Sequence, residues 1–209
     1  MTELHPPRGR PAASQSALIA GRIVDAAWEV LLETGPEQFS LDRVASAAHA
    51  SKQTIYARFS GKLELLQAVL AARTGSIFAE LAEIMESGEI EAVIAEVTRR
   101  SASVLSAPEA MMLDRLVDWI DSAQSGSSAR TREEIYGEMH GLLRRCLERA
   151  VAQSQLSIED IDGAASFWLD GLIGHVRGVS RGGAQLEQWA CTFARYFLRA
   201  VSGRGDHSG

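Results

Sequence analysis

Apolar residues recur every three to four positions along most of this 209-residue chain. This spacing places them on one face of an α-helix, and no long run of alternating β-branched residues indicates a strand. Short clusters of Gly, Pro and Ser interrupt the pattern, and they lie at residues 34–36, 60–61, 87–88, 107–108, 125–128 and 181–183. The sequence therefore predicts an all-α protein of about nine helices.

The first predicted helix begins at Ser14 or Ser16 and runs to Glu33, because Gly35 and Pro36 follow as a helix stop. A long helix is predicted over 62–87. Five further helices are predicted at about 90–106, 109–123, 129–153, 158–181 and 185–202.

Two short helices separated by a tight break are predicted between Ser40 and Lys62. Ser40 and Ser51 are good N-caps, because a serine hydroxyl can accept from a backbone N–H of the first turn. Ile55 and Phe59, four residues apart, form the inward face of the second helix. Its outward face carries Lys52, Gln53, Thr54, Tyr56 and Arg58. This arrangement is typical of a helix-turn-helix DNA reader.

Several residues of this stretch match one family pattern, and they are Ser40-Leu41, Ala45, Ala48-His49-Ala50-Ser51, Thr54-Ile55-Tyr56, Phe59 and Lys62. With these residues the segment resembles the DNA-binding domain of the TetR family of bacterial repressors. The match is specific over about residues 14–70 and only architectural beyond. The family usually has glycine where this chain has His49, so we expect a left-handed backbone there.

The resemblance implies a three-helix DNA-binding domain at residues 14–61 and a helical ligand-binding and dimerisation domain at residues 62–203. Residues 1–13 lack helical periodicity and are expected to form a flexible N-terminal arm. Residues 204–209 are expected to be a disordered tail.

The formal net charge of −6 argues against a protein that binds nucleic acid indiscriminately. Residues 1–66 hold seven Lys and Arg against seven Asp and Glu, so the excess acid lies beyond them. Both lysines of the chain, Lys52 and Lys62, fall inside the helix-turn-helix stretch. A basic face on a neutral domain suits sequence-specific binding.

The outward face of the second short helix is therefore the predicted DNA contact, with the helix N-termini at Ser40 and Ser51 facing phosphate. In the arm, Arg8 and Arg10 stand between prolines as in an AT-hook, which follows an A·T minor groove. The alternatives are a solvated helix face and a solubilising tail. The predicted DNA-binding residues are Arg8, Arg10, Ser40, Ser51, Lys52, Gln53, Thr54, Tyr56, Arg58 and Lys62.

The family resemblance implies an effector pocket inside the C-terminal body. The candidates share an apolar or aromatic character at internal helix positions, and they are Phe78, Met85, Met112, Leu116, Trp119, Tyr136, His140 and Phe167. This character favours a hydrophobic or aromatic ligand. Plain core packing is the alternative for each of them.

The last two predicted helices carry more than one apolar face, which a single intrachain partner cannot cover. Two copies packed as a four-helix bundle would cover both, and the same arrangement is the usual dimer interface of the family. The predicted interface consists of Phe167, Gly171, Gly174, Gly178, Leu186, Trp189, Phe193 and Phe197. The alternative is that both faces are intrachain core.

Other chemistries lack their motifs. There is no Gly-rich phosphate loop, nucleophile elbow or paired-acid motif, so we expect no enzyme and no cofactor. Cys146 and Cys191 show no metal-ligand spacing, and we expect free thiols in a reducing cytoplasm, with a redox switch as the alternative. No signal peptide and no apolar run of membrane-spanning length are evident.

These patterns favour a cytoplasmic, dimeric, ligand-responsive repressor that binds a palindromic double-stranded operator and is released by a small-molecule effector. The first alternative is a helix-turn-helix activator or architectural protein without a small-molecule ligand. The second is a helical interaction module that no longer binds DNA.

Overall fold

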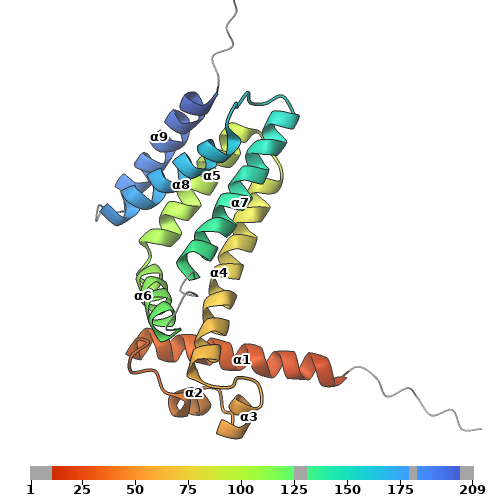
Figure 1. The fold of residues 1–209 in the computed structure, drawn as a ribbon, viewed down its shortest axis with the longest axis vertical. Helices are drawn as coiled ribbons and strands as arrows, with labels where there is room; N and C mark the ends of the chain where they lie inside the picture. The colour runs from red at the N-terminus through yellow and green to blue at the C-terminus, as the bar shows by residue number, and fades with distance from the viewer. Residues whose placement is uncertain (1–10, 125–130, 179–182, 203–209) are drawn as a thin grey trace, which may run out of the picture. The chain divides into compact units, whose positions relative to one another are not determined.

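The computed structural model describes residues 11–124, 131–178 and 183–202. Every regular element in these ranges is an α-helix, which confirms the predicted all-α fold (Figure 1). The helices are α1 (Pro11–Thr34), α2 (Leu41–Ala47), α3 (Lys52–Tyr56), α4 (Lys62–Glu86), α5 (Ile90–Ser106), α6 (Pro108–Ala123), α7 (Thr131–Ala152), α8 (Ile161–Gly178) and α9 (Gly183–Val201).

The start of α1 differs from the prediction. The helix begins at Pro11 and not at Ser14 or Ser16, so residues 11–13 of the predicted flexible arm are helical. Proline is well tolerated in a first helical turn, because its φ is already helical and the N–H that it lacks would have no partner there. At the other end Gly35 has a φ of +70° and donates its N–H to the Leu31 carbonyl (2.8 Å), as the predicted stop requires.

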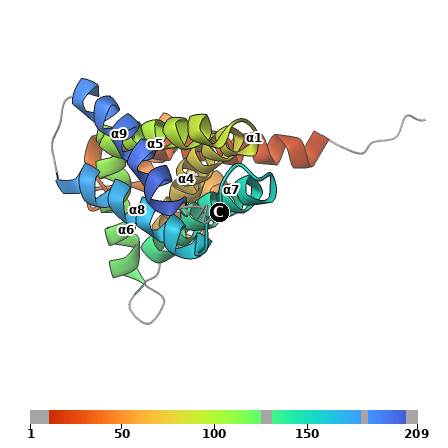
Figure 2. The same cartoon turned by 90° about the horizontal axis from the view of Figure 1, so that it is seen from above.

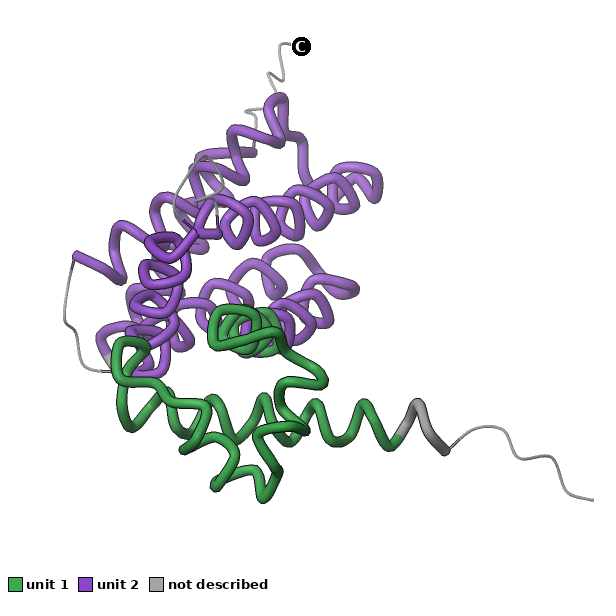
Figure 3. The backbone as a smooth tube through the Cα atoms, turned by 60° about the horizontal axis from the view of Figure 1, so that its bottom comes forward, with its two compact units in different colours: residues 1–72 green, residues 73–209 purple. Residues whose placement is uncertain are grey.

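The chain divides into two compact units, residues 1–72 and 73–209 (Figure 3). The N-terminal unit contains α1, α2, α3 and the first turns of α4. The sequence placed a boundary at 61/62, whereas this unit extends to Ala72. The reason is visible in the burial: Leu65, Leu66 and Val69 are completely buried, yet they lie outside the core cluster of the C-terminal unit.

The C-terminal unit is built around α5, which packs against α6, α8 and α9, while α7 packs against α6 and α8 (Figure 2). Trp168 of α8 is completely buried in the core. Its indole Nε1 donates to the Thr98 hydroxyl (2.9 Å), which itself donates to the Ile94 carbonyl (2.6 Å). The polar atoms of this pair are thus satisfied inside the core.

Helix α4 is long and apolar enough to meet a length-and-composition test for a membrane span, which the sequence analysis did not anticipate. The window that passes has a mean hydropathy of only 1.2. Core helices pass the same test, and Leu66, Val69 and Phe78 of α4 are buried against the protein's own residues. The test is therefore weak evidence for a membrane span.

Candidate nucleic-acid interface

Both short helices of the N-terminal unit begin at a serine that caps them, as predicted. The Ser40 hydroxyl accepts from the Asp42 N–H (3.2 Å) at the start of α2. The Ser51 hydroxyl accepts from the Thr54 N–H (3.0 Å) at the start of α3 and lies 2.8 Å from the Thr54 hydroxyl. Each cap satisfies an N–H that the helix itself cannot pair. The two hydroxyls thus set where the helices begin.

The turn between α2 and α3 depends on a left-handed residue. His49 has a φ of +48°, which confirms the expectation drawn from the missing glycine. The Ala50 N–H then donates to the Ala45 carbonyl (2.9 Å), a bond that closes a helix end in the Schellman manner. Arg22 of α1 donates to the Ala48 carbonyl (3.1 Å) at the same end. This hydrogen bond from Arg22 holds the turn that sets the orientation of α3.

One side of α3 is anchored in the core of the N-terminal unit. Ile55 is completely buried and Phe59 is 8% exposed, as their spacing predicted. Ile23 of α1 and Val44 of α2 are also completely buried, and α2 packs on both α1 and α3. A helix of five residues has little stability of its own. Its orientation therefore comes from these apolar contacts.

The opposite side of α3 faces solvent. Lys52 and Gln53 are exposed, Thr54 is half-buried and the Tyr56 side chain is 55% exposed. Tyr56 thus shares one solvent-exposed helix face with Lys52 and Gln53. Lys52 forms an ion pair with Asp42 of α2. Both partners of this pair are mostly exposed, so their attraction is weak and the ammonium can exchange to another anion.

Two further predicted contacts have structural partners in the same unit. Arg58 donates to the Thr54 carbonyl (3.1 Å) and so closes the end of α3. Lys62 donates to the Glu37 carbonyl (3.4 Å), and its ammonium lies 5.9 Å above the centre of the Phe39 ring. Partial burial lowers the pKa of Lys62 below its usual value, and this effect outweighs the attraction to Glu37. Arg8 and Arg10 lie outside the described residues.

This geometry matches a family pattern. Residues 23–69, which include α2, α3 and their buried anchors, match the family described as bacterial regulatory proteins, tetR family. The N-terminal unit is thus a DNA-binding domain of the TetR family. Over 50 residues it is 52% identical to the DNA-binding transcriptional repressor TetR of Mycobacteroides abscessus, an alignment that covers 24% of this chain and 26% of that one. The curated relatives that it matches are covered over only 26–48% of their own lengths.

Solved structures resemble this chain over nearly its full length. A TetR-family transcriptional regulator of Mesorhizobium loti superposes with a TM-score of 0.77 over 90% of this chain and 99% of the other, at 23% identity. The transcriptional regulator FadR of Bacillus subtilis, solved in complex with stearoyl-CoA, gives a TM-score of 0.61 at 19% identity, over 87% and 98% of the two chains. At these identities the likeness establishes the fold.

The C-terminal unit contains an apolar pocket of about 90 Å³ between α4, α5, α7 and α8. Phe78 and Tyr136, two of the predicted ligand residues, line it. Apolar side chains form most of the remaining wall, and the sequence analysis named none of them: Ile77, Leu81, Val104, Leu105, Ile135, Met139, Leu169, Leu172 and Ile173. Ser101 completes the wall. Helical spacing can indicate that such residues are buried, but it cannot show that they share a pocket.

The other six predicted ligand residues do not line this pocket. Met85 is core, and Met112, Leu116 and Trp119 lie on α6, which contributes no wall residue. His140 lies 3.2 Å from both the Asp162 carbonyl and the Ser166 hydroxyl, at the start of α8. Phe167 is 52% exposed. Sequence spacing gives the buried face of a helix but not its neighbour, so it could not show which residues share this pocket.

The structure places the predicted dimer residues in different environments. Phe197 is 1% exposed and belongs to the core of its own chain, so its assignment to an intermolecular surface is wrong. A Cβ on Gly171 would lie 2.6 Å from the Phe193 ring, so this glycine admits an aromatic side chain of its own chain. Gly174 and Gly178 have open space where a Cβ would stand. Leu186 and Trp189 are half-buried.

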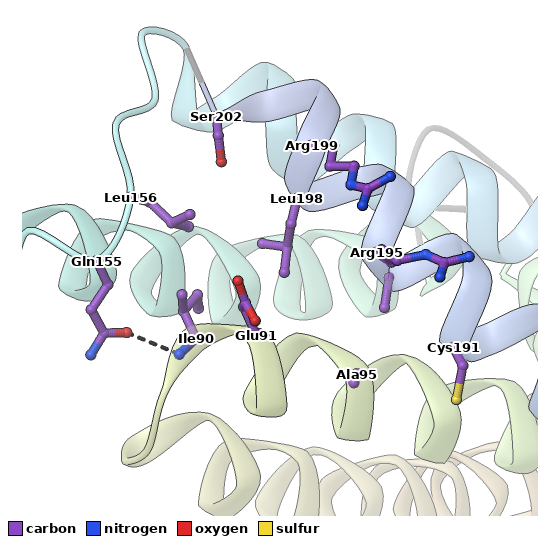
Figure 4. A pocket seen from close by; sticks show the side chains of 11 residues that line it. Ile90, Glu91, Ala95, Gln155, Leu156, Cys191, Arg195, Leu198, Arg199 and Ser202 are labelled. Carbon is purple, nitrogen blue, oxygen red and sulfur yellow. Dashed lines mark hydrogen bonds between the residues drawn. The ribbon is translucent and has the colours of Figure 1, made fainter. Parts of the chain in front are cut away.

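A larger depression of about 680 Å³ lies where the start of α5, the α7–α8 connection and α9 meet (Figure 4). Gln155 lies at one end of it, and its Oε1 accepts from the Ile90 N–H (2.9 Å). Arg195 and Arg199 of α9 border it, together with the exposed Cys191 (Figure 4). The depression is thus lined partly by charged side chains, in contrast to the apolar pocket.

Proposed function

We propose that this TetR-family chain is a dimeric, sequence-specific transcriptional regulator. In its simplest form it is a repressor that a small hydrophobic or aromatic effector releases from a palindromic operator. The observation that carries the proposal is the exposed polar face of α3, presented on a helix whose other face is anchored by Ile55 and Phe59. In the described part of the chain, this face combines lysine, glutamine and an exposed tyrosine on one short helix.

The contacts follow from the chemistry of this face. Gln53 can pair with the edge of adenine in the major groove, and Lys52 with guanine or with phosphate. Tyr56 can donate its hydroxyl to a phosphate oxygen. Asp42 competes with DNA for the Lys52 ammonium, because the two form an ion pair in the free protein. This competition weakens nonspecific binding to DNA phosphates and so favours sequence-specific binding.

A dimer supplies the second reading helix that a palindrome needs. Phe167 of α8 and Tyr196 of α9 are 52% and 59% exposed in the single chain. Trp189 and Phe193 of α9 are half-buried, and their rings stack with a centroid distance of 5.0 Å. A second copy packed on these helices would remove this aromatic surface from water.

The effector site that we propose is the apolar pocket of the C-terminal unit. Helix α4 starts directly after the DNA-reading motif and carries Ile77, Phe78 and Leu81 into the pocket wall. Occupancy that selects another position of α4 would change the spacing of the two reading helices. The stearoyl-CoA bound by Bacillus subtilis FadR is a poor model for this ligand. It carries phosphate groups, and no Lys, Arg or His lines the pocket.

The alternative is an activator or architectural DNA-binding protein without a small-molecule ligand. Its DNA-reading surface would be the same, and only the response to an effector separates the two. In either case we expect the protein in the cytoplasm, together with chromosomal DNA.

Selection of bound duplexes from a random DNA pool, with the full-length protein, tests the proposal. We expect enrichment of a palindrome whose half-sites lie about one helical turn or somewhat more apart. Native mass spectrometry of the complex should show two protomers on each duplex. A pool without an enriched motif, or a single asymmetric half-site occupied by one protomer, would refute it.

A further inference from the structure

The apolar pocket presents no polar surface to a ligand. Two of its wall residues carry a hydroxyl, and they are Ser101 of α5 and Tyr136 of α7. Both oxygens are buried away from the pocket, and the Tyr136 hydroxyl interacts with the Arg132 guanidinium. The two residues therefore contribute carbon atoms to the wall, as do the aliphatic, phenylalanine and methionine side chains around them.

An unfilled space of this size is unusual inside a protein. Protein interiors are packed about as densely as organic crystals, and voids larger than a water molecule are few. The pocket measures about 90 Å³, although Leu81, Met139 and Leu172 of its wall belong to the buried core of the C-terminal unit. A buried water needs about two to four polar partners, and this wall offers none. The space is therefore suited to an apolar occupant.

The surroundings of the pocket restrict the charge of a ligand. The wall contains no Asp, Glu, Lys, Arg or His. Two cations lie close to Tyr136, but both are paired with carboxylates of α6. Arg177, 6.0 Å from the ring centre, pairs with Asp114 (2.8 Å), and Arg132 pairs with Asp114 and Asp118 (2.7 Å each). A charged ligand would therefore enter the pocket without a counter-charge, which is strongly unfavourable.

The volume and the opening of the pocket restrict the size of a ligand. An engineered cavity of about 150 Å³ binds one benzene molecule, so a pocket of about 90 Å³ holds a short alkyl chain or most of one ring. Leu105, a wall residue near the end of α5, is 37% exposed. The pocket thus reaches the protein surface there, and the rest of a ring can extend toward solvent.

We propose, taking this pocket as the effector site of the proposed function, that it selects a small uncharged hydrocarbon, either a single ring or a short chain. Affinity comes from the removal of apolar surface from water and from contacts with wall atoms that the empty space leaves without neighbours. A polar group on the buried part of the ligand would lose its hydration and find no partner in the wall. The pocket therefore discriminates by polarity as well as by size.

Benzene, pyrazine and benzoate test this selectivity, because they share one ring and differ in polarity and charge. Pyrazine has the shape of benzene, and its two nitrogens lie on opposite sides of the ring, so every orientation buries at least one of them. Each probe is titrated into the full-length protein without DNA, and the methyl NMR signal of Met139, a wall residue, reports on the pocket. We expect a saturable shift with benzene and at least about ten-fold weaker binding of the other two.

Val104→Thr is the variant that should change the selectivity. Val104 is a half-buried wall residue of α5, and threonine keeps nearly the same shape while placing a hydroxyl in the wall. Because this hydroxyl can donate to a ring nitrogen, the preference for benzene over pyrazine should shrink about five-fold, the effect of one neutral hydrogen bond. Val176→Thr is the matched control: Val176 of α8 is also half-buried but lies outside the pocket wall, so both affinities should stay unchanged.

Three results would overturn the inference: no saturable shift with benzene, pyrazine or benzoate binding as tightly as benzene, or a benzene preference that Val104→Thr leaves unaltered. None of these results depends on operator binding, so they leave the DNA-reading role untouched. If instead benzene binds as described and operator affinity stays constant, the ligand class stands and the effector-release mechanism fails.

Discussion

Replacing Thr98 by valine tests the packing of the C-terminal unit. The two side chains have nearly the same shape, so the substitution removes the hydroxyl and leaves little cavity. The completely buried Trp168 indole then loses the acceptor that lies 2.9 Å from its Nε1. A buried donor left without a partner costs about 1–3 kcal/mol. We expect a loss of about 2 kcal/mol, or a decrease of about 1 M in urea midpoint if the slope is about 2 kcal/mol/M.

Hydrogen exchange of the α5 and α8 amides as a function of urea measures this loss locally, without assuming that the two units unfold together. Ser101→Ala on the same helix is the control of opposite sign, because its hydroxyl has no described partner. A Thr98→Val variant as stable as the wild type would show that the Trp168–Thr98 bond contributes nothing.

Three further predictions concern single positions. His49→Gly should stabilise the N-terminal unit by up to about 1 kcal/mol in thermal unfolding, because the backbone φ at His49 is +48°. Ala48→Gly is the control: with a φ of −77° at this position, the substitution should destabilise the unit by a similar amount. Gly171→Ala should lower the free energy of unfolding by about 1–3 kcal/mol, because the new methyl group clashes with the Phe193 ring. Gly174→Ala, in open space, should leave monomer stability unchanged or raise it. In sedimentation experiments it should weaken only dimerisation. Burial raises the pKa of Cys146 and outweighs the opposing effect of Arg149, so at neutral pH thiol reagents should label it far more slowly than the chain's exposed cysteine.

The sequence predicted those features of the fold that depend on local chemistry. The caps at Ser40 and Ser51 and the left-handed turn at His49 follow from a few neighbouring residues. Burial of Ile55 and Phe59 was predicted from their four-residue spacing, although α3 ends at Tyr56, before Phe59. All of these could be recognised without knowledge of the tertiary structure.

The pocket and the proposed dimer surface were predicted less well, because both depend on which helices meet. Phe197 looked like part of an outer apolar stripe but is covered by its own chain. Met112 and Phe167 have the composition of pocket residues and lie elsewhere. Nothing in the sequence indicated that Ser101 is buried without a hydrogen-bond partner. A serine in a helix becomes informative only when its burial and its missing partner are seen together.

The central claim is that the exposed face of α3 reads DNA. The most direct test is fluorescence anisotropy of the full-length protein on the selected palindrome, comparing wild type with a Lys52→Ala, Tyr56→Ala double variant. An Arg199→Ala variant removes the same single positive charge from the C-terminal unit as the control. We predict about a 100-fold loss of affinity for the first variant, the effect of two contacts of about 1–2 kcal/mol each, and none for the control. Equal affinity of the α3 variant and the wild type would contradict the account.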